Sequence, residues 1–193
     1  MSTLILVRHG QTDANRDGLL LGRSDPSLNP TGREQAAAAA LRVASFGPVR
    51  VLSSPLLRAR ETAEIVAGEL GLTVGLDHRL IEVDYGDHEG TPLAELPRDL
   101  QARWRTDPAF APPGGESLAE VQVRVGDFAA EVLGQVRDGP VVAVSHVSPI
   151  KAVVCWALGL GPLHQWRMRL DNATLTRLAP GPDGPVLLSF NER

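Results

Sequence analysis

The sequence of 193 residues lacks the features that mark secreted, membrane and disulfide-stabilised proteins. It contains one cysteine, Cys155, which cannot form a disulfide within the chain. It has no long apolar segment and no block of like charge, which argues against a membrane span and against wholesale disorder. The N-terminus lacks the charged, apolar and small-residue regions of a secretory signal. We therefore expect a cytoplasmic protein without a membrane partner.

The sequence also lacks an excess of positive charge. Its formal net charge is −4, which argues against a nucleic-acid partner, because such binding requires broad basic patches. Any anion site must then be a local cluster. Hydrophobic residues are 43% and charged residues 22%, as in an ordinary globular protein, and the length favours one domain over residues 1–193.

A short apolar run over residues 4–7 is followed directly by Arg8, His9 and Gly10. The run is too short to cross a membrane and predicts a buried strand. Arg8 offers a fork of donors for an anion, His9 offers a nitrogen that titrates near neutrality, and Gly10 lets backbone approach closely. This combination indicates a phosphate site that contains a histidine. The alternative is a solvated Arg-His pair at a strand end.

Strand and helix signals alternate along the rest of the chain. Asn29 and Pro30 open a helix, Ser54 and Pro55 are suited to begin another, and Gly71 is suited to end it. This alternation predicts an α/β fold, a three-layer α/β/α sandwich with a mostly parallel central sheet and helices on both faces. The expected strands are 4–7, 49–52, 72–77, 141–144 and a closing hairpin of 172–178 with 186–190; the expected helices begin near 30, 55, 118 and 147, with a loop over 11–27 and a helical excursion over 91–113.

The ends of three predicted strands carry chemically active side chains. His9 follows the first strand, His146 follows the strand 141–144, and Arg58 lies one turn into the helix after the strand 49–52. If these strands are parallel neighbours, Arg8, His9, Arg58 and His146 converge at one edge of the sheet. Two helix N-termini then add N–H groups and favourable dipoles, and phosphate is the natural occupant.

A phosphoryl transfer at this site also needs an acid. Because a leaving alkoxide is too basic to depart unprotonated, one carboxyl group of the acidic segment 80–90 must lie near the ester oxygen. The candidates for this role are Glu82, Asp84, Asp87 and Glu89. Asp84, Asp87 and Glu89 also fit turn and surface positions, and Asp84 is the substitute for Glu82 among them.

Five motifs occur in a fixed order along the chain. They are residues 6–12 followed by Asn15, residues 53–59 with 62–63, residues 80–82 leading to 86 and 89–90, residues 114–117, and residues 144–146. Together they resemble the histidine phosphatase superfamily, whose best-known branch is cofactor-dependent phosphoglycerate mutase. The resemblance spans nearly the whole chain and implies a phosphoglycerate mutase-like fold.

The resemblance implies a role for several of these residues. His9 becomes phosphorylated, Glu82 donates the proton, and His146 acts with them as a third catalytic residue. Arg8, Arg58 and Asn15 bind phosphate. Gln11, Thr12, Arg23 and Ser148 are weaker predictions for substrate contact. The resemblance implies neither a metal nor another cofactor.

The sequence departs from the family pattern at two places. Val147 and Ser148 follow His146 where many relatives have small residues, and the Ser148 hydroxyl is an added donor. His88 stands where relatives often carry tryptophan, and is interpreted as packing or pocket wall. His78 and His164 lie outside the motifs and are expected to be structural or exposed. Ser117 is expected to cap a helix.

These observations favour a phosphomonoesterase that hydrolyses small phosphorylated metabolites through a phosphohistidine. Cofactor-dependent phosphoglycerate mutase is the nearest alternative. A two-histidine, one-carboxylate metal site and a non-catalytic module that binds phospho-ligands are further alternatives. The expected partner is a small phosphorylated substrate, and the chain is expected to be a monomer or homodimer.

Overall fold

Six strands form one mixed sheet in the computed structural model, which describes residues 3–135 and 139–193. Their order is β3-β2-β4-β1-β5-β6. The pairs β1/β4, β4/β2 and β2/β3 are parallel, whereas β5 and β6 form an antiparallel hairpin beside β1. The predicted sheet and its closing hairpin are therefore confirmed. The strands are β1 (Leu4–Arg8), β2 (Arg50–Ser53), β3 (Val74–Leu76), β4 (Val141–Ser145), β5 (Leu175–Ala179) and β6 (Val186–Glu192).

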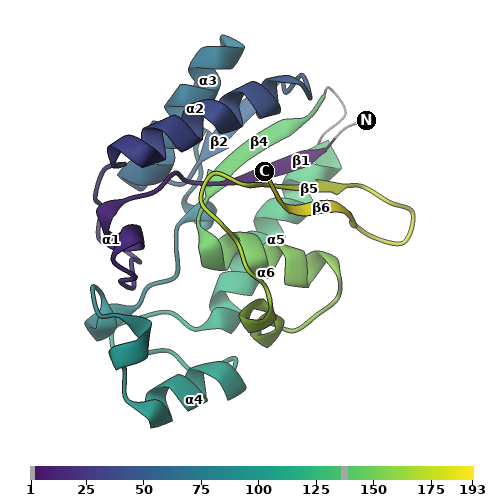
Figure 1. Cartoon of the computed structure of the whole chain (residues 1–193). Coiled ribbons are helices and arrows are strands. Elements are labelled where there is room, and N and C mark those ends of the chain that lie inside the picture. The colour runs from purple at the N-terminus through teal and green to yellow at the C-terminus, as the bar shows by residue number, and fades with distance from the viewer. Residues whose placement is uncertain (1–2, 136–138) are drawn as a thin grey trace.

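Helices cover both faces of this sheet, so the predicted three layers are confirmed. Figure 1 shows α2 (Pro30–Ala44) and α3 (Leu57–Leu70) on one face, and α5 (Leu118–Gln135) and α6 (Val147–Ala157) on the other. The remaining helical segments are α1 (Asp13–Arg16), α4 (Arg98–Thr106) and the 3-10 turns η1 (His78–Leu80), η2 (Gly86–His88), η3 (Leu93–Glu95) and η4 (Pro162–Arg167).

Strand β1 is apolar throughout because both of its faces are covered. Leu4 and Leu6 pack into the hydrophobic cluster under α5 and α6, and Ile5 and Val7 pack into the cluster under α2 and α3. All four side chains are at most 1% exposed. Such a continuous apolar run is typical of a central strand in a parallel sheet.

The start of α3 differs from the prediction. Pro55 is not the first helical residue and Ser54 is not the cap, because the helix begins at Leu57 after the extended residue Leu56. The backbone N–H of Leu57 instead donates to the carboxylate of Asp25 in the preceding loop. The Ser54 hydroxyl is used inside the site described below.

Other boundaries differ by a few residues. The expected loop 11–27 contains α1, which is closed by a capping box between Thr12 and Asn15. The strands expected over 49–52, 72–77 and 172–178 occupy Arg50–Ser53, Val74–Leu76 and Leu175–Ala179. The helix expected to begin near residue 118 is described from Leu118 to Gln135, and residues 136–138 lie outside the described part.

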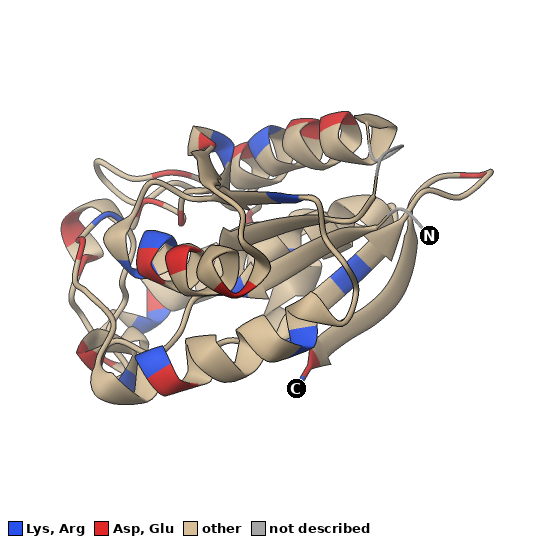
Figure 2. Cartoon of the chain, turned by 90° about the horizontal axis from the view of Figure 1, so that it is seen from above, with Lys and Arg blue, Asp and Glu red and all other residues tan. Residues whose placement is uncertain are grey.

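The excursion 91–113 forms η3 and α4, which lie apart from the sheet at the bottom of Figure 1. Trp104, Phe110 and Leu118 form a small hydrophobic cluster of their own there. Figure 2 shows that basic and acidic positions are interspersed along the helices of the described chain. Within residues 3–135 and 139–193, no helix combines the length and apolar character needed to cross a membrane.

Candidate active site

The register of the sheet brings the ends of β1, β4 and β2 together. Arg8 pairs with Ser145, and Ser53 pairs with Val144. The rings of His9 and His146 consequently lie 5.0 Å apart between centroids. His9 is 2% exposed and His146 is fully buried. The predicted convergence of the two histidines is thus confirmed.

His9 has one ring nitrogen free for chemistry. Its Nδ1 lies 2.7 Å from the carbonyl oxygen of Gly10, which can only accept, so Nδ1 carries the proton and Nε2 carries a lone pair. Burial, followed by the charges of Arg58 and Arg8, holds the pKa of His9 well below its ordinary value. A buried neutral imidazole with a free Nε2 is suited to attack phosphorus.

His146 is neutral for the same reasons. Burial, then Arg58 and His9, hold the pKa of His146 well below its ordinary value. Its Nε2 is hydrogen-bonded to the Ser54 hydroxyl at 2.7 Å, while its buried Nδ1 has no partner among the described residues. A dianion beside His146 would oppose this shift, because a nearby negative charge favours the protonated imidazole.

Arg58 is held in place by backbone carbonyls. Its Nη1 donates to Ser24 at 2.7 Å, and its Nη2 donates to Gly22 at 2.8 Å and to Leu21 at 3.3 Å. Three of the five N–H donors are therefore used, which leaves the Nε proton and one Nη1 proton. Nε is buried and has no partner within the described residues. These two remaining donors are available to the oxygens of a phosphoryl group.

Arg8 has a similar arrangement. Its Nη1 donates to the carbonyl oxygen of Leu170 at 2.6 Å, and its buried Nε has no partner in the described chain. Burial lowers the pKa of Arg8 to about 10, against the opposing charges of Glu82 and Asp171. We call Arg8, His9, Arg58 and His146 the phosphate site. Its buried, unpartnered donors surround two neutral imidazoles.

Glu82 lies at the N-terminus of α6. Its carboxylate accepts from the backbone N–H groups of Val83 at 2.8 Å, Val147 at 3.1 Å and Ser148 at 3.2 Å. Burial raises the pKa of Glu82, although the N–H groups and Arg58 oppose the shift. A carboxyl group whose pKa is raised toward neutrality is suited to general acid catalysis.

Both predicted helix N-termini are present, but their first N–H groups face carboxylates. At α6 they bind Glu82, and at α3 the first N–H group binds Asp25. The contribution of these helix N-termini to phosphate binding therefore stays a prediction, and their first N–H groups bind side-chain carboxylates. The physical reason is that each N-terminus attracts the nearest anion, and in this chain that anion is a side chain.

Glu89 does more than the predicted turn or surface role. Its two carboxylate oxygens accept from the backbone N–H groups of Gly22 at 2.8 Å, Ser24 at 3.0 Å and Arg23 at 3.2 Å. The carbonyls of the same loop hold Arg58. Glu89 therefore fixes the loop that positions the phosphate clamp. No sequence pattern links residue 89 to residues 22–24, so this contact was missed.

Gly10 is required by close packing with a helix rather than by the ligand. A Cβ on Gly10 would lie 2.2 Å from the carbonyl oxygen of Gly32 in α2, and a Cβ on Gly32 would lie 2.1 Å from the carbonyl oxygen of Gln11. The expected close approach is real, but its partner is Gly32. The Gly10 N–H donates to the Thr62 hydroxyl at 3.1 Å.

Asn15 and Thr12 have structural contacts at the edge of the site. The Thr12 hydroxyl and the Asn15 side chain cap α1, and Thr12 is fully buried. Asn172 donates to the His9 carbonyl oxygen at 3.1 Å and to the Asn15 side-chain oxygen at 3.4 Å. These bonds place Asn15 beside the His9 backbone, while the phosphate contact of Asn15 and the substrate contact of Thr12 stay predictions.

Gln11 and Arg23 are occupied by other partners. The Gln11 side-chain oxygen accepts from Asn29 at 3.1 Å. Arg23 lies 3.4 Å from Asp84 and 3.5 Å from Glu116, so its charge is matched by carboxylates. Asp84 is committed to that cluster, which favours Glu82 over Asp84 as the acid.

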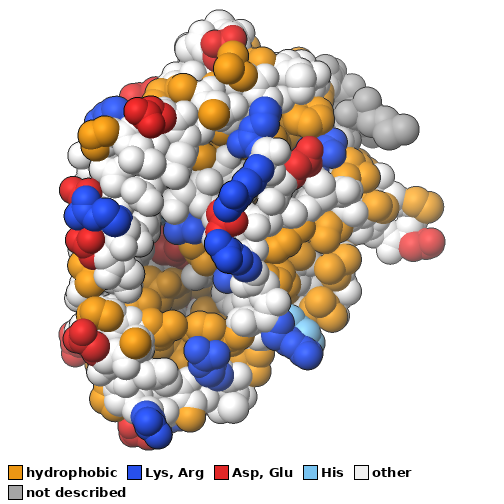
Figure 3. Space-filling view, in the orientation of Figure 1, with side chains coloured by type: hydrophobic (Ala, Val, Ile, Leu, Met, Phe, Trp, Pro, Cys, Tyr) orange, Lys and Arg blue, Asp and Glu red, His pale blue; other side chains and the backbone are white. Residues whose placement is uncertain are grey.

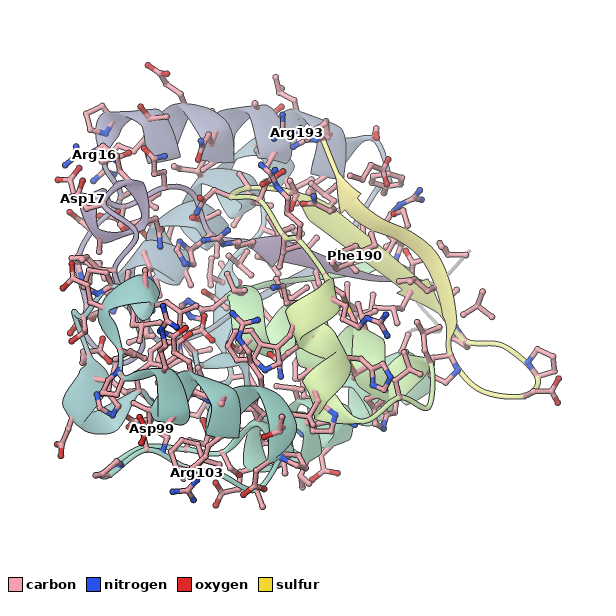
Figure 4. All side chains as sticks on the ribbon, turned by 60° about the horizontal axis from the view of Figure 1, so that its bottom comes forward. Arg16, Asp17, Asp99, Arg103, Phe190 and Arg193 are labelled. Carbon is pink, nitrogen blue, oxygen red and sulfur yellow. The ribbon has the colours of Figure 1, made fainter. Side chains whose placement is uncertain are left out.

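Arg16 is exposed and ion-paired with Asp13 at 2.8 Å and Asp17 at 2.9 Å. Figure 4 shows Arg16 and Asp17 together at the edge of the molecule, whereas Asp99 and Arg103 lie along α4. Of the residues outside the motifs, His78 and His164 are exposed as expected. Ser117 caps α5 through a reciprocal pair of bonds with Glu120, also as expected.

A cavity of about 230 Å³ lies beside α6, and we call it the side cavity. Ser148 lines it, as predicted for a substrate contact, whereas His88 is not among its lining residues. Figure 3 shows the molecule hollowed between the regions of α1 and α4, with charged side chains inside the hollow and hydrophobic ones below them. The residues that line the side cavity are Leu20, Tyr85, Leu93, Trp104, Leu118, Val147, Ser148, Lys151, Gln165 and Trp166.

Comparison with known proteins agrees with this geometry. The sequence model of the histidine phosphatase superfamily (branch 1) matches residues 4–193. A bifunctional protein of Mycobacterium tuberculosis is 40% identical over 90% of this chain, which spans 49% of that relative, or about half its length. A glucosyl-3-phosphoglycerate phosphatase of Mycobacterium tuberculosis is 36% identical, over 93% of this chain and 88% of its own.

The fold has equally similar solved structures. A phosphoserine phosphatase from Entamoeba histolytica, in complex with 3-phosphoglyceric acid, superposes with a TM-score of 0.92 and 30% identity, over 100% of this chain and 98% of that one. The family and fold predicted from the five motifs are thereby confirmed. The chain belongs to the histidine phosphatase superfamily.

Proposed function

We propose that this protein is a phosphomonoesterase that hydrolyses small phosphorylated metabolites through a phosphohistidine at His9. The observation that carries the proposal is the pair of buried histidines, 5.0 Å apart between ring centroids, together with two arginines that have buried, unpartnered Nε donors. Buried donors without partners are costly, and a phosphate dianion would satisfy them. The lowered pKa of His9 keeps its Nε2 lone pair available as the nucleophile.

In the first step the His9 Nε2 lone pair forms a bond to phosphorus while the bond from phosphorus to the ester oxygen breaks. Arg8, Arg58 and His146 stabilise the charge on the equatorial oxygens. Glu82 gives its proton to the leaving oxygen, so that an alcohol departs rather than an alkoxide.

In the second step water replaces the alcohol. The Glu82 carboxylate takes a proton from the attacking water, the bond from Nε2 to phosphorus breaks, and inorganic phosphate leaves with His9 restored. The relatives named for glucosyl-3-phosphoglycerate phosphatase and phosphoserine phosphatase activity support hydrolysis over the mutase alternative. The small side cavity supports a metabolite-sized leaving group.

We place this activity in the cytoplasm and in one domain over residues 1–193. The free, buried Cys155 is compatible with a reducing compartment, and one sheet contains every named strand of the described chain. A soluble phosphorylated metabolite is the partner that fits this setting.

Rapid quench with a ³²P-labelled phosphomonoester tests the proposal. The wild-type protein should give an acid-labile, base-stable adduct that maps to His9, together with release of inorganic phosphate. His9→Ala should lose the adduct and lower turnover by about 10⁴-fold or more, as for removal of other catalytic nucleophiles.

His164→Ala is the matched control, because His164 is exposed and bonded only to Gly161 in its own turn. It should retain the adduct and normal turnover. Binding of the ester by the wild-type protein without an adduct or phosphate release would instead indicate a non-catalytic phospho-ligand module.

A further inference from the structure

Lys151 is the only lysine in a chain with 19 lysine and arginine residues. It lies on α6, three and four residues after Ser148 and Val147, and therefore on the same face of the helix as these two residues. All three line the side cavity. All the remaining lysine and arginine positions of the chain are arginine. The one flexible ammonium group of the chain therefore lies in the wall of the side cavity.

The Lys151 ammonium group has no hydrogen bond or ion pair to any described residue. Among the described residues, the charged and titratable groups that influence it are Arg8, Glu82 and Cys155, and no carboxylate there forms an ion pair with it. Burial, followed by Arg8, lowers the pKa of Lys151. An anion in the cavity would oppose both effects by favouring the charged form.

A second donor in the cavity wall also lacks a partner. Trp104 is 1% exposed, and its indole N–H has no hydrogen-bond acceptor among the described residues. The remaining wall is mainly aromatic and aliphatic, with Tyr85, Trp166 and Leu93 among its members.

The side cavity adjoins the proposed acid. Val147 and Ser148 line it, and their backbone N–H groups bind the Glu82 carboxylate at 3.1 and 3.2 Å. The oxygen that receives the proton from Glu82 belongs to the leaving group. The leaving group must therefore lie on the side of Glu82 where this cavity opens.

We propose that the side cavity binds the organic part of the substrate and that Lys151 pairs with an anionic group on it. The substrate class is then a small phosphomonoester with a second negative charge, either a carboxylate or a second phosphate. Lys151 is the specificity-determining residue for that charge. The effect that we expect of Lys151 on turnover rests on the proposed hydrolysis. The effect that we expect of Lys151 on binding does not depend on hydrolysis.

The volume supports a small occupant. About 230 Å³ is below the range of about 300–1,000 Å³ that is typical of pockets for drug-sized ligands. An anion paired with Lys151 leaves room for a short carbon skeleton between it and the ester oxygen. The aromatic and aliphatic wall lowers the local dielectric, which strengthens the ion pair relative to one on the surface.

Three esters that share a glycerol skeleton test the inference. They are 3-phosphoglycerate with a carboxylate, glycerol 1,3-bisphosphate with a second phosphate, and glycerol 3-phosphate with a neutral hydroxymethyl group. The wild-type protein should prefer one charged ester over glycerol 3-phosphate in kcat/KM, and the preferred ester identifies the anion. Lys151→Met should lower this preference by about ten- to hundred-fold, the range expected for loss of a hydrogen bond to a charged group.

Two variants separate this role from a structural one. Lys151→Arg restores the charge and should recover most of the preference. Arg50→Met removes one exposed charge at the opposite end of β2 and should leave the preference as in the wild type. Equal preference in the wild type and Lys151→Met, with normal thermal unfolding, would overturn the inference.

Calorimetry separates this result from a failure of the proposed function. The three esters are titrated into His9→Ala with and without Lys151→Met. A charge preference that disappears with Lys151→Met supports the inference even if no ester is hydrolysed by the wild-type protein, in which case the phosphatase proposal fails alone. A binding preference that Lys151→Met leaves unchanged overturns the inference, whatever the turnover.

Discussion

The phosphate site and the side cavity are neighbours that differ in what holds their side chains. In the phosphate site, backbone carbonyls fix the cations, as Ser24 and Gly22 do for Arg58 and Leu170 does for Arg8. In the side cavity, Lys151 has no such partner among the described residues, and side chains from distant segments form the wall. A rigid clamp suits the phosphoryl group, which is common to all substrates. A wall built of side chains can vary with the leaving group.

We expect the largest loss of turnover from a substitution of Glu82, which lies between the phosphate site and the side cavity. Glu82→Gln keeps the shape of the side chain but cannot supply a proton. Turnover of alkyl phosphates should fall by about 10²- to 10⁴-fold, and turnover of aryl phosphates much less, because their leaving groups need little protonation. Steady-state kcat on matched alkyl and aryl esters measures the difference.

Asp84→Asn is the control for Glu82→Gln, because Asp84 is bound to Arg23 rather than to α6. It should not distinguish alkyl from aryl esters. Equal losses on both ester types in Glu82→Gln would contradict the acid role and indicate damage to the phosphate site.

The next effect tests the rigidity of the clamp. Arg58→Lys retains the charge but cannot bond three carbonyls and a phosphoryl group at once, because an ammonium lacks the planar fork. We expect kcat/KM to fall by about 10²-fold or more for every ester, charged or neutral. Arg60→Lys, on the same helix, is the control. A loss confined to the charged esters would contradict the division between the two regions.

A smaller effect should follow when the support of the clamp is weakened. Glu89→Gln replaces one acceptor oxygen by a donor, so at least one N–H group of the loop 22–24 loses its partner. We expect inhibition by inorganic phosphate to weaken by about ten-fold, the cost of one charge-assisted hydrogen bond. Asp87→Asn, at an exposed neighbour, should have no effect. Unchanged inhibition in Glu89→Gln would show that Arg58 is held without Glu89.

The smallest effect concerns stability and pH. The pKa values of His9 and His146 are lowered in the folded protein, whereas in the unfolded chain they titrate near 6.5. As pH falls below about 6.5, these two histidines bind protons in the unfolded chain but stay neutral in the folded protein. The contribution of the two neutral histidines to the free energy of unfolding should therefore be greatest above about pH 6.5. It should decrease at lower pH, by up to about 1.4 kcal/mol per pH unit for each histidine.

Urea unfolding between pH 7.5 and 5.5 measures this slope. His9→Asn and His146→Asn should each reduce it, whereas His164→Asn, at an exposed site, should not. Glu82 acts in the opposite direction, because its raised pKa makes the folded state bind protons before the unfolded chain does as pH falls. A flat profile in both the wild-type protein and Glu82→Gln, where the opposing carboxyl group is absent, would mean that the histidines are charged in the folded state.

The same comparison explains what could be predicted from the sequence. The phosphate site was predictable because Arg8, His9, Arg58 and His146 follow apolar runs, and parallel strands bring their ends together. The side cavity was not predictable, because Lys151 and Trp104 come from distant helices and line the same cavity only through tertiary packing. The contacts of Glu89 and Asp25 were missed for a related reason, because loop contacts across 30 to 70 residues leave no periodic pattern in the sequence.

The contact between Gly10 and Gly32 limits how this catalytic centre can be transplanted. The loop after β1 fits only because α2 has no side chain where the two backbones meet. A designer who grafts the Arg8, His9, Gly10 turn onto another parallel sheet must therefore import a glycine in the first turn of the facing helix as well. Without it, a Cβ on the helix would lie 2.1 Å from the carbonyl oxygen of the residue after the turn, so the turn that holds the histidine would have to move.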